Sequence, residues 1–249
     1  MIDGMRVLVG LGLTLLLVML RIEAQRFGAA EYDEPVDGHD PSILRRLGWY
    51  IAGVAGILAL LLVHPTAELS LFLQIGDRWG VILALGLGAL GVGQAIAVAW
   101  YHYRRLRFPD IGAYPSALVN QILTAFIDEA VFRGALLGYF LFAGAPELLA
   151  IVGQAVVYVL ATRLGAPGRD RYMLVLAGAI GLIGGWATIA TGGIGAAFLG
   201  HAITSVAVFL TTGHAGNPPA RGTDIEDVER RRRTPEGWRA VDRSGARDR

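Results

Sequence analysis

Long apolar runs divide the sequence, each close to the length of a helix that crosses a lipid bilayer. The hydrocarbon core of a bilayer needs about 20 apolar residues per helix, and a helix satisfies its own backbone hydrogen bonds in lipid. Hydrophobic residues make up 54% of the 249 residues and charged residues 17%, which is typical of membrane proteins. The runs cover residues 7–20, 47–63, 80–101, 115–143, 146–164, 172–190 and 192–212. We therefore expect an all-α transmembrane bundle with about seven spans.

The arginines predict how these spans cross the membrane. They follow the first, third, fifth and seventh runs, with nine after the last, whereas the alternate flanks carry only Arg6 and Arg78. Because arginine concentrates on the cytoplasmic side, the N-terminus is predicted outside and the C-terminus in the cytoplasm. No small-residue cleavage site follows Leu20, so we expect the first run to be an uncleaved span. The pattern favours a multi-pass protein of a prokaryotic plasma membrane.

Three regions are expected along the chain. Residues 1–114 would form N-terminal transmembrane helices with a cytoplasmic loop, and residues 115–212 a membrane core. Residues 213–249 have few apolar residues and many charges, which predicts a disordered basic cytoplasmic tail. Membrane topology accounts for the arginines of this tail, so we expect no nucleic-acid partner. The oligomeric state does not follow from the sequence.

Two motif classes are excluded or discounted. The chain contains neither cysteine nor lysine, which excludes disulfides, cysteine nucleophiles and serine–lysine dyads. Gly86, Gly88 and Gly91 have the spacing of a dinucleotide-binding motif but lie inside an apolar run, close to Gly93. Small residues in such a run let neighbouring helices approach closely, and we expect no cofactor there.

One apolar run carries an unusual cluster of charges at Asp128, Glu129 and Arg133. Charged side chains within a membrane helix are costly unless they are paired or hydrated, and they mark functional sites. Glu129 and Arg133 are one helical turn apart and are expected to pair, whereas Asp128 has no obvious local partner. Asp128 is therefore the carboxylate that we expect to be available for chemistry.

A later run contains His201, the histidine that lies well inside a span, and Ser205 one helical turn beyond it on the same face. Histidine exchanges protons near neutral pH. Its occurrence together with a carboxylate on another helix favours an active site over a histidine that serves packing alone.

These residues resemble the motifs of the CAAX protease and bacteriocin-processing family of intramembrane endopeptidases, also called the abortive-infection family. That family has the motifs Glu-Glu-x-x-x-Arg, an aromatic residue shortly before a histidine, and His-x-x-x-Asn. The resemblance covers about residues 115–210, with Phe132-Arg133-Gly134 in the first motif. Three family positions differ: Asp128 stands for the first glutamate, Thr162 (after Tyr158) for the first histidine, and Ser205 for the asparagine.

The resemblance implies an endopeptidase that cleaves a peptide or protein near the cytoplasmic membrane surface. Asp128 would polarise a water molecule and His201 would assist proton transfer. Glu129 and Arg133 would fix the geometry. Ser205 and Thr162 would orient the water or stabilise the tetrahedral oxyanion.

Two alternatives remain open from the sequence. The three substitutions also fit a catalytically silent family member that binds a peptide or partner in immunity or regulation. A proton-coupled transporter could use Asp128 and His201 as a relay, although no internal repeat is visible. We expect no tightly bound metal, because catalytic zinc sites use three protein ligands and only Asp128 and His201 remain at the matched positions.

Overall fold

The computed structural model describes residues 2–29, 43–104, 106, 108, 115–166 and 171–213, and within these ranges the chain forms helices and no strand. The first half contains α1 (Ile2–Ile22), η1 (Glu23–Gln25), α2 (Ile43–Val63), α3 (Ala67–Ser70) and α4 (Trp79–Tyr103). The second half contains α5 (Pro115–Asp128), η3 (Glu129–Leu136), α6 (Leu137–Phe142), α7 (Glu147–Gly165), α8 (Arg171–Thr191) and α9 (Gly195–Thr212). The predicted all-α architecture is confirmed.

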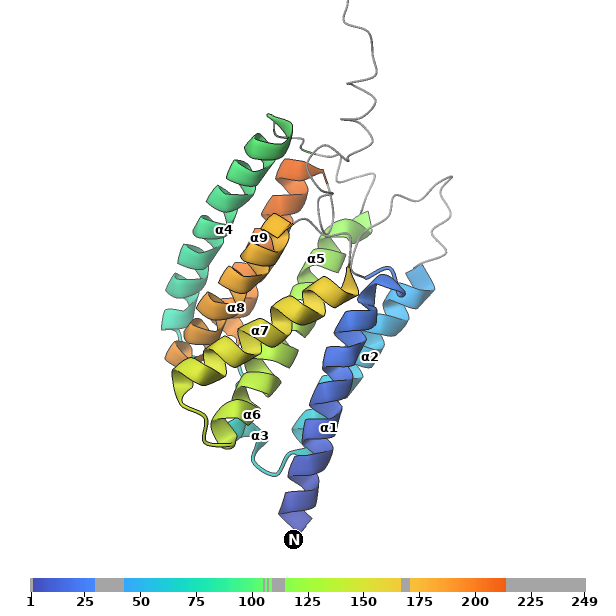
Figure 1. The fold of residues 1–249 in the computed structure, drawn as a ribbon, viewed down its shortest axis with the longest axis vertical. Coiled ribbons are helices and arrows are strands. Elements are labelled where there is room, and N and C mark those ends of the chain that lie inside the picture. The colour runs from blue at the N-terminus through green and yellow to red at the C-terminus, as the bar shows by residue number, and fades with distance from the viewer. Residues whose placement is uncertain are drawn as a thin grey trace, which may run out of the picture.

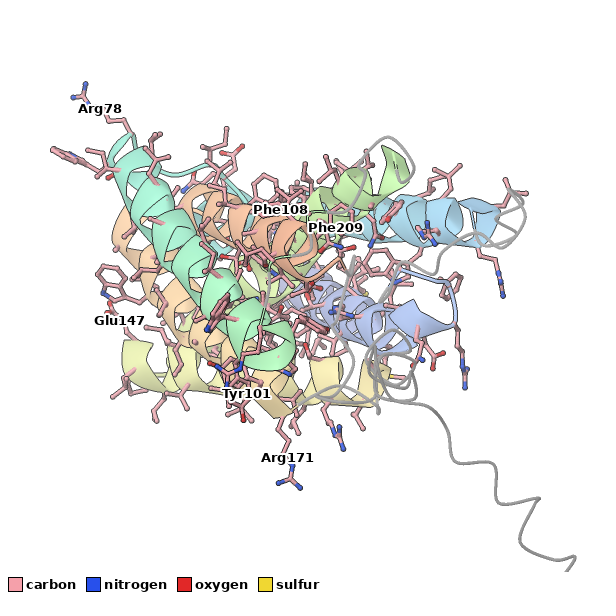
Figure 2. All side chains as sticks on the ribbon, turned by 90° about the horizontal axis from the view of Figure 1, so that it is seen from above. Arg78, Tyr101, Phe108, Glu147, Arg171 and Phe209 are labelled. Carbon is pink, nitrogen blue, oxygen red and sulfur yellow. The ribbon has the colours of Figure 1, made fainter. Side chains whose placement is uncertain are left out.

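Six of these helices, α1, α2, α4, α7, α8 and α9, are long and apolar enough to cross a membrane. Their outward faces carry exposed leucines such as Leu16, Leu62 and Leu85, as expected for surfaces in contact with lipid. The charged side chains of Arg78 and Arg171 extend from the periphery of the bundle (Figure 2). The chain is thus a multi-pass membrane protein, and its predicted orientation stays a prediction.

The fourth predicted span, residues 115–143, corresponds to three consecutive helices, α5, η3 and α6. It carries the charged cluster, and it is not one uninterrupted apolar helix like the other six. The predicted disordered tail lies, apart from Gly213, outside the described residues, as does most of the predicted cytoplasmic loop after α1.

The helices run mostly along the long axis of the molecule (Figure 1). The pair α1 and α2 forms one side of the bundle, and α4 packs along α9 on the other. Between them lie α5, η3 and α6, while α7 runs obliquely and contacts both α8 and α1 (Figure 1). The charged segment therefore occupies the centre of the bundle.

Two glycines of α4 allow its close packing on α9. A Cβ atom on Gly88 would lie 2.8 Å from the side chain of Ile203, and one on Gly91 would also meet α9. Gly86 and Gly93 have no neighbour within 4 Å of such an atom. The packing role expected from the sequence is therefore confirmed for Gly88 and Gly91. It is wrong for Gly86 and Gly93, because the helical period turns these two residues away from α9.

A short segment, residues 71–77, enters the bundle between α3 and α4 and bonds to the start of α9. The Ile194 N–H donates to the carbonyl oxygens of Phe72 and Gln74 at 3.1 and 2.9 Å, and the Phe72 N–H donates to the Gly134 carbonyl at 3.3 Å. Gly138 provides the space for this approach, because a Cβ atom there would collide with the backbone at Ser70. The segment thereby fixes the charged helix against α9.

Replacement of Gly138 by alanine is expected to lower the free energy of unfolding by about 1–3 kcal/mol, because overpacking against backbone cannot be relieved by a rotamer change. Gly93→Ala is the matched control, since Gly93 also lies within a helix but faces open space. Unfolding of the detergent-solubilised variants measures the difference. Equal stabilities for the two variants would contradict the proposed close contact at Gly138.

Candidate active site

The charged cluster is located where α5 continues into η3, a π-helix whose eight residues are all buried. In a π-helix the backbone N–H bonds to the carbonyl five residues earlier, as the Leu137 N–H does to Phe132. Such turns are rare and occur frequently at functional sites. The predicted pair is confirmed, because Arg133 Nε lies 3.3 Å from Glu129 Oε2 and both side chains are fully buried.

Glu129 also holds the histidine of α9. Its Oε1 lies 2.8 Å from His201 Nδ1, while its Oε2 faces Arg133. A carboxylate oxygen only accepts hydrogen bonds, so with Glu129 ionised beside Arg133 the N–H of His201 Nδ1 donates in this contact. The other ring nitrogen, Nε2, is then the proton acceptor of a neutral imidazole. The structure thus gives Glu129 a second partner that was not expected from its spacing to Arg133.

Asp128 has a partner from a distant part of the chain. Arg21 Nε lies 2.6 Å from Asp128 Oδ1, and the Tyr158 hydroxyl donates to Asp128 Oδ2 at 3.4 Å. In the sequence Arg21 is one of the arginines that follow the first apolar run; in the structure α1 extends to Ile22, and Arg21 is only 4% exposed. The ion pair with Asp128 accounts for this burial, because a buried charge requires an opposite charge nearby.

Tyr158 of α7 connects the two ion pairs. Its ring centre lies 4.2 Å from Cζ of Arg133, a cation–π contact, and 6.3 Å from the ring centre of His201. Its hydroxyl reaches Asp128. With His201 neutral, the two guanidiniums of the cluster balance its two carboxylates. The cluster therefore meets the requirement of charge neutrality in an apolar interior.

A cavity of about 80 Å³ lies beside this cluster. Three residues expected to form a site, Asp128, His201 and Ser205, line it together with Arg21 and Tyr158. The structure therefore brings side chains of α1, α5, α7 and α9 to one small polar space.

The other expected site residues lie outside the lining of this cavity. Glu129 and Arg133 lie behind His201 and Tyr158, which they contact. Thr162 lies one turn beyond Tyr158 on α7, is 1% exposed, and its hydroxyl has no hydrogen-bond partner among the described residues. Thr162 is thus not brought together with Asp128 and His201 around the cavity.

An apolar groove of about 140 Å³ reaches His201 from another direction. It lies between α4, α8 and α9 and is lined mainly by aliphatic side chains, among them Leu87, Leu90 and Ile183. His201 and Thr204 line both the groove and the polar cavity. His201 is therefore placed at the junction between an apolar surface and a polar one.

Two cavity residues, Arg21 and Gln121, were not expected from the sequence. Gln121 precedes Asp128 by seven residues, so the helical period places both on one face of α5. A polar residue on the same face as Asp128 could therefore have been predicted to line the site. Arg21 gave no comparable signal, because an arginine at the end of an apolar run is typical of a cytoplasmic flank.

In the part of the chain that the structure describes, no three side chains of histidine, cysteine, aspartate or glutamate lie close enough to hold a metal ion. The carboxylates of the cluster are engaged instead by Arg21, Arg133 and His201. The expectation that no metal binds tightly stays a prediction.

Comparison with known proteins gives one match. Residues 110–207 match the family model of Rce1-like type II CAAX prenyl endopeptidases. No curated protein and no solved structure matches the chain. The matched segment contains every site residue expected from the sequence, from Asp128 to Ser205, and it agrees with the resemblance drawn from the motifs. Residues 110–207 are thus similar to Rce1-like type II CAAX prenyl endopeptidases, which points to a membrane protease.

Proposed function

We propose that this protein is a membrane-embedded endopeptidase that cleaves a peptide or protein substrate near the cytoplasmic surface of a prokaryotic plasma membrane. One observation carries the proposal: His201, bonded through Nδ1 to Glu129, lines the same cavity as Asp128 and Ser205. A histidine held in one tautomer by a carboxylate is a general base that can also return the proton.

In this mechanism His201 is the proton carrier. A water molecule in the cavity attacks the carbonyl carbon of the scissile bond, and His201 Nε2 takes the proton of that water. Glu129 orients the imidazole and stabilises the imidazolium that forms, while Arg133 holds Glu129 in place. His201 then returns the proton to the leaving amine as the carbon–nitrogen bond breaks.

Asp128 and Ser205 position the reacting groups. Arg21 holds Asp128 in an ion pair, and Asp128 accepts a hydrogen bond from the second hydrogen of the water. Ser205 follows His201 by one turn and donates its hydroxyl to the developing oxyanion. Thr162 has no direct role here, since it does not line the cavity.

A catalytically silent role as a peptide-binding immunity or regulatory protein is the second candidate. The 2.6 Å ion pair between Arg21 and Asp128 favours it, because this pair occupies the carboxylate that the family resemblance assigns to water activation. Thr162 in place of a family histidine points in the same direction. Cleavage that appears only in a Thr162→His variant would support this candidate.

The decisive experiment is cleavage profiling of the reconstituted protein with a library of membrane peptides. We expect the wild type to cleave, and His201→Ala and Asp128→Ala to lower the rate by about 10²–10⁴-fold, the usual contribution of a general base. His102→Ala is the matched control, because His102 lies at the end of α4 and does not line the cavity. An inactive wild type, or full activity in His201→Ala, would refute the proposed endopeptidase.

A further inference from the structure

Two buried hydrogen-bond donors beside Asp128 have no acceptor among the described residues. Nη1 of Arg21 and Nε2 of Gln121 are both buried and unpaired, and the two side chains are only 4% and 6% exposed. A buried donor without an acceptor is destabilising, and more so if it is charged. Two such donors on residues that line one cavity indicate a place for an oxygen that is not part of this chain.

Both donors belong to the lining of the cavity that contains His201 and Ser205. Arg21 is held there through its Nε, which faces Asp128 Oδ1. Because a guanidinium is planar and rigid, fixing Nε also fixes the direction of Nη1. Gln121 is fixed by its position on α5, two turns before Asp128. The Arg21 donor is therefore oriented before any substrate arrives, and α5 places Gln121 in the same lining.

The size of the cavity restricts what these donors can meet. At about 80 Å³ it admits a few water-sized groups, compared with about 30 Å³ for one water in the liquid. This is room for a carbonyl group with an attacking water. An oxygen of the reacting group is therefore an acceptor that these two donors can meet.

We propose that Arg21 and Gln121 join Ser205 in the oxyanion site of this protein, binding the negatively charged oxygen of the tetrahedral intermediate. The inference rests on the proposed endopeptidase function and adds catalytic residues that lie outside the family motifs. It gives Arg21 two tasks: its Nε pairs with Asp128, and its Nη1 binds the oxyanion.

The formation and breakdown of the tetrahedral intermediate need only the peptide, one water molecule and these side chains. The water oxygen bonds to the carbonyl carbon, the π electrons of the carbonyl move to its oxygen, and His201 takes the proton of the water. Arg21 Nη1–H and Gln121 Nε2–H then donate to the oxyanion. When the oxyanion collapses, the carbon–nitrogen bond breaks, and the amine leaves with the proton from His201. Since both donors are unpaired beforehand, their bonds are gained mainly in the transition state, where they accelerate the reaction.

The test uses full-length protein in lipid nanodiscs and two measurements: peptide cleavage, and binding of a peptidyl phosphonate, whose tetrahedral anion mimics the intermediate. Arg21→Lys keeps the charge opposite Asp128 but loses the planar pair of donors. We expect its kcat to fall about 10²–10³-fold with little change in KM, and its phosphonate affinity to fall in parallel. Gln121→Met, which keeps the side-chain volume, should change both quantities in the same direction.

Asn120→Ala is the matched control. Asn120 neighbours Gln121 and is equally buried, but it bonds to Tyr50 and does not line the cavity, so kcat and phosphonate affinity should stay at the wild-type value. Normal kcat and normal phosphonate affinity in folded Arg21→Lys and Gln121→Met would overturn the inference while leaving the endopeptidase intact. A wild type that binds the phosphonate through Arg21 but cleaves no peptide would keep the anion site and refute the proposed function. A wild type that does not bind the phosphonate would overturn the inference.

Discussion

Replacement of Glu129 by glutamine is expected to lower kcat by about 10⁴-fold, close to the loss found when the carboxylate behind a catalytic histidine becomes an amide. The Glu129 carboxylate accepts a hydrogen bond from the N–H of His201 Nδ1 across 2.8 Å. An amide at the same place can turn its NH₂ toward Nδ1, which moves the ring proton to Nε2 and removes the base. Substrate binding should change less, because Glu129 does not line the cavity.

The matched control is Glu147→Gln, which makes the same chemical change at the exposed start of α7. It should keep the wild-type kcat. The measurement is steady-state kinetics on the best peptide of the library, with thermal melting to verify that Glu129→Gln remains folded. If Glu129→Gln retained wild-type kcat, Glu129 would be a structural partner of Arg133 alone, and His201 would need another group to orient it.

The helices of the bundle could be predicted from the sequence because burial in lipid imposes a simple requirement. Each span must be long and apolar, and all seven predicted runs correspond to helical segments. The pair of Glu129 and Arg133 could also be predicted, since both lie on one segment and their spacing alone brings them together. Structural features that depend on local periodicity could therefore be predicted from the sequence.

The contacts between distant segments could not be predicted in this way. The pairing of Arg21 with Asp128 depends on how α1 packs against η3 and α7, which no local pattern encodes. The arginine pattern also pointed away from it, because Arg21 fits the positive flank of a span equally well. The π-helix was missed for a related reason. Its extra residue per turn is stabilised by tertiary contacts, among them the bond from the Phe72 N–H to the Gly134 carbonyl.

The position of the histidine illustrates the same limit. The sequence suggested a site that combined His201 with a carboxylate of the charged segment, and Asp128 was the expected partner because Glu129 pairs with Arg133. In the structure His201 contacts Glu129, although Glu129 also pairs with Arg133. A carboxylate has two oxygens and can serve two partners at once. Local pairing therefore does not exclude a second contact across the bundle.

Replacement of Arg133 by methionine is expected to lower the free energy of unfolding by about 3–5 kcal/mol. Arg133 is fully buried, and its removal leaves the Glu129 carboxylate in an apolar interior without its cation. The packing of Tyr158 against the guanidinium is lost as well, although methionine fills much of the same volume. Reversible unfolding in mixed micelles measures the loss. Arg171→Met is the control, since Arg171 is exposed at the start of α8 and should change stability by about 0.5 kcal/mol or less.

The double variant Glu129→Gln with Arg133→Met separates the cost of an unpaired charge from the loss of packing. Removing both partners leaves no charge uncompensated, so most of the stability lost in Arg133→Met should return. Activity should not return with it, because His201 has lost the carboxylate that orients it. A double variant as unstable as Arg133→Met would mean that packing around Tyr158, and not charge pairing, makes Arg133 necessary. A double variant that is stable but inactive would show that the ion pair exists to hold Glu129 against His201.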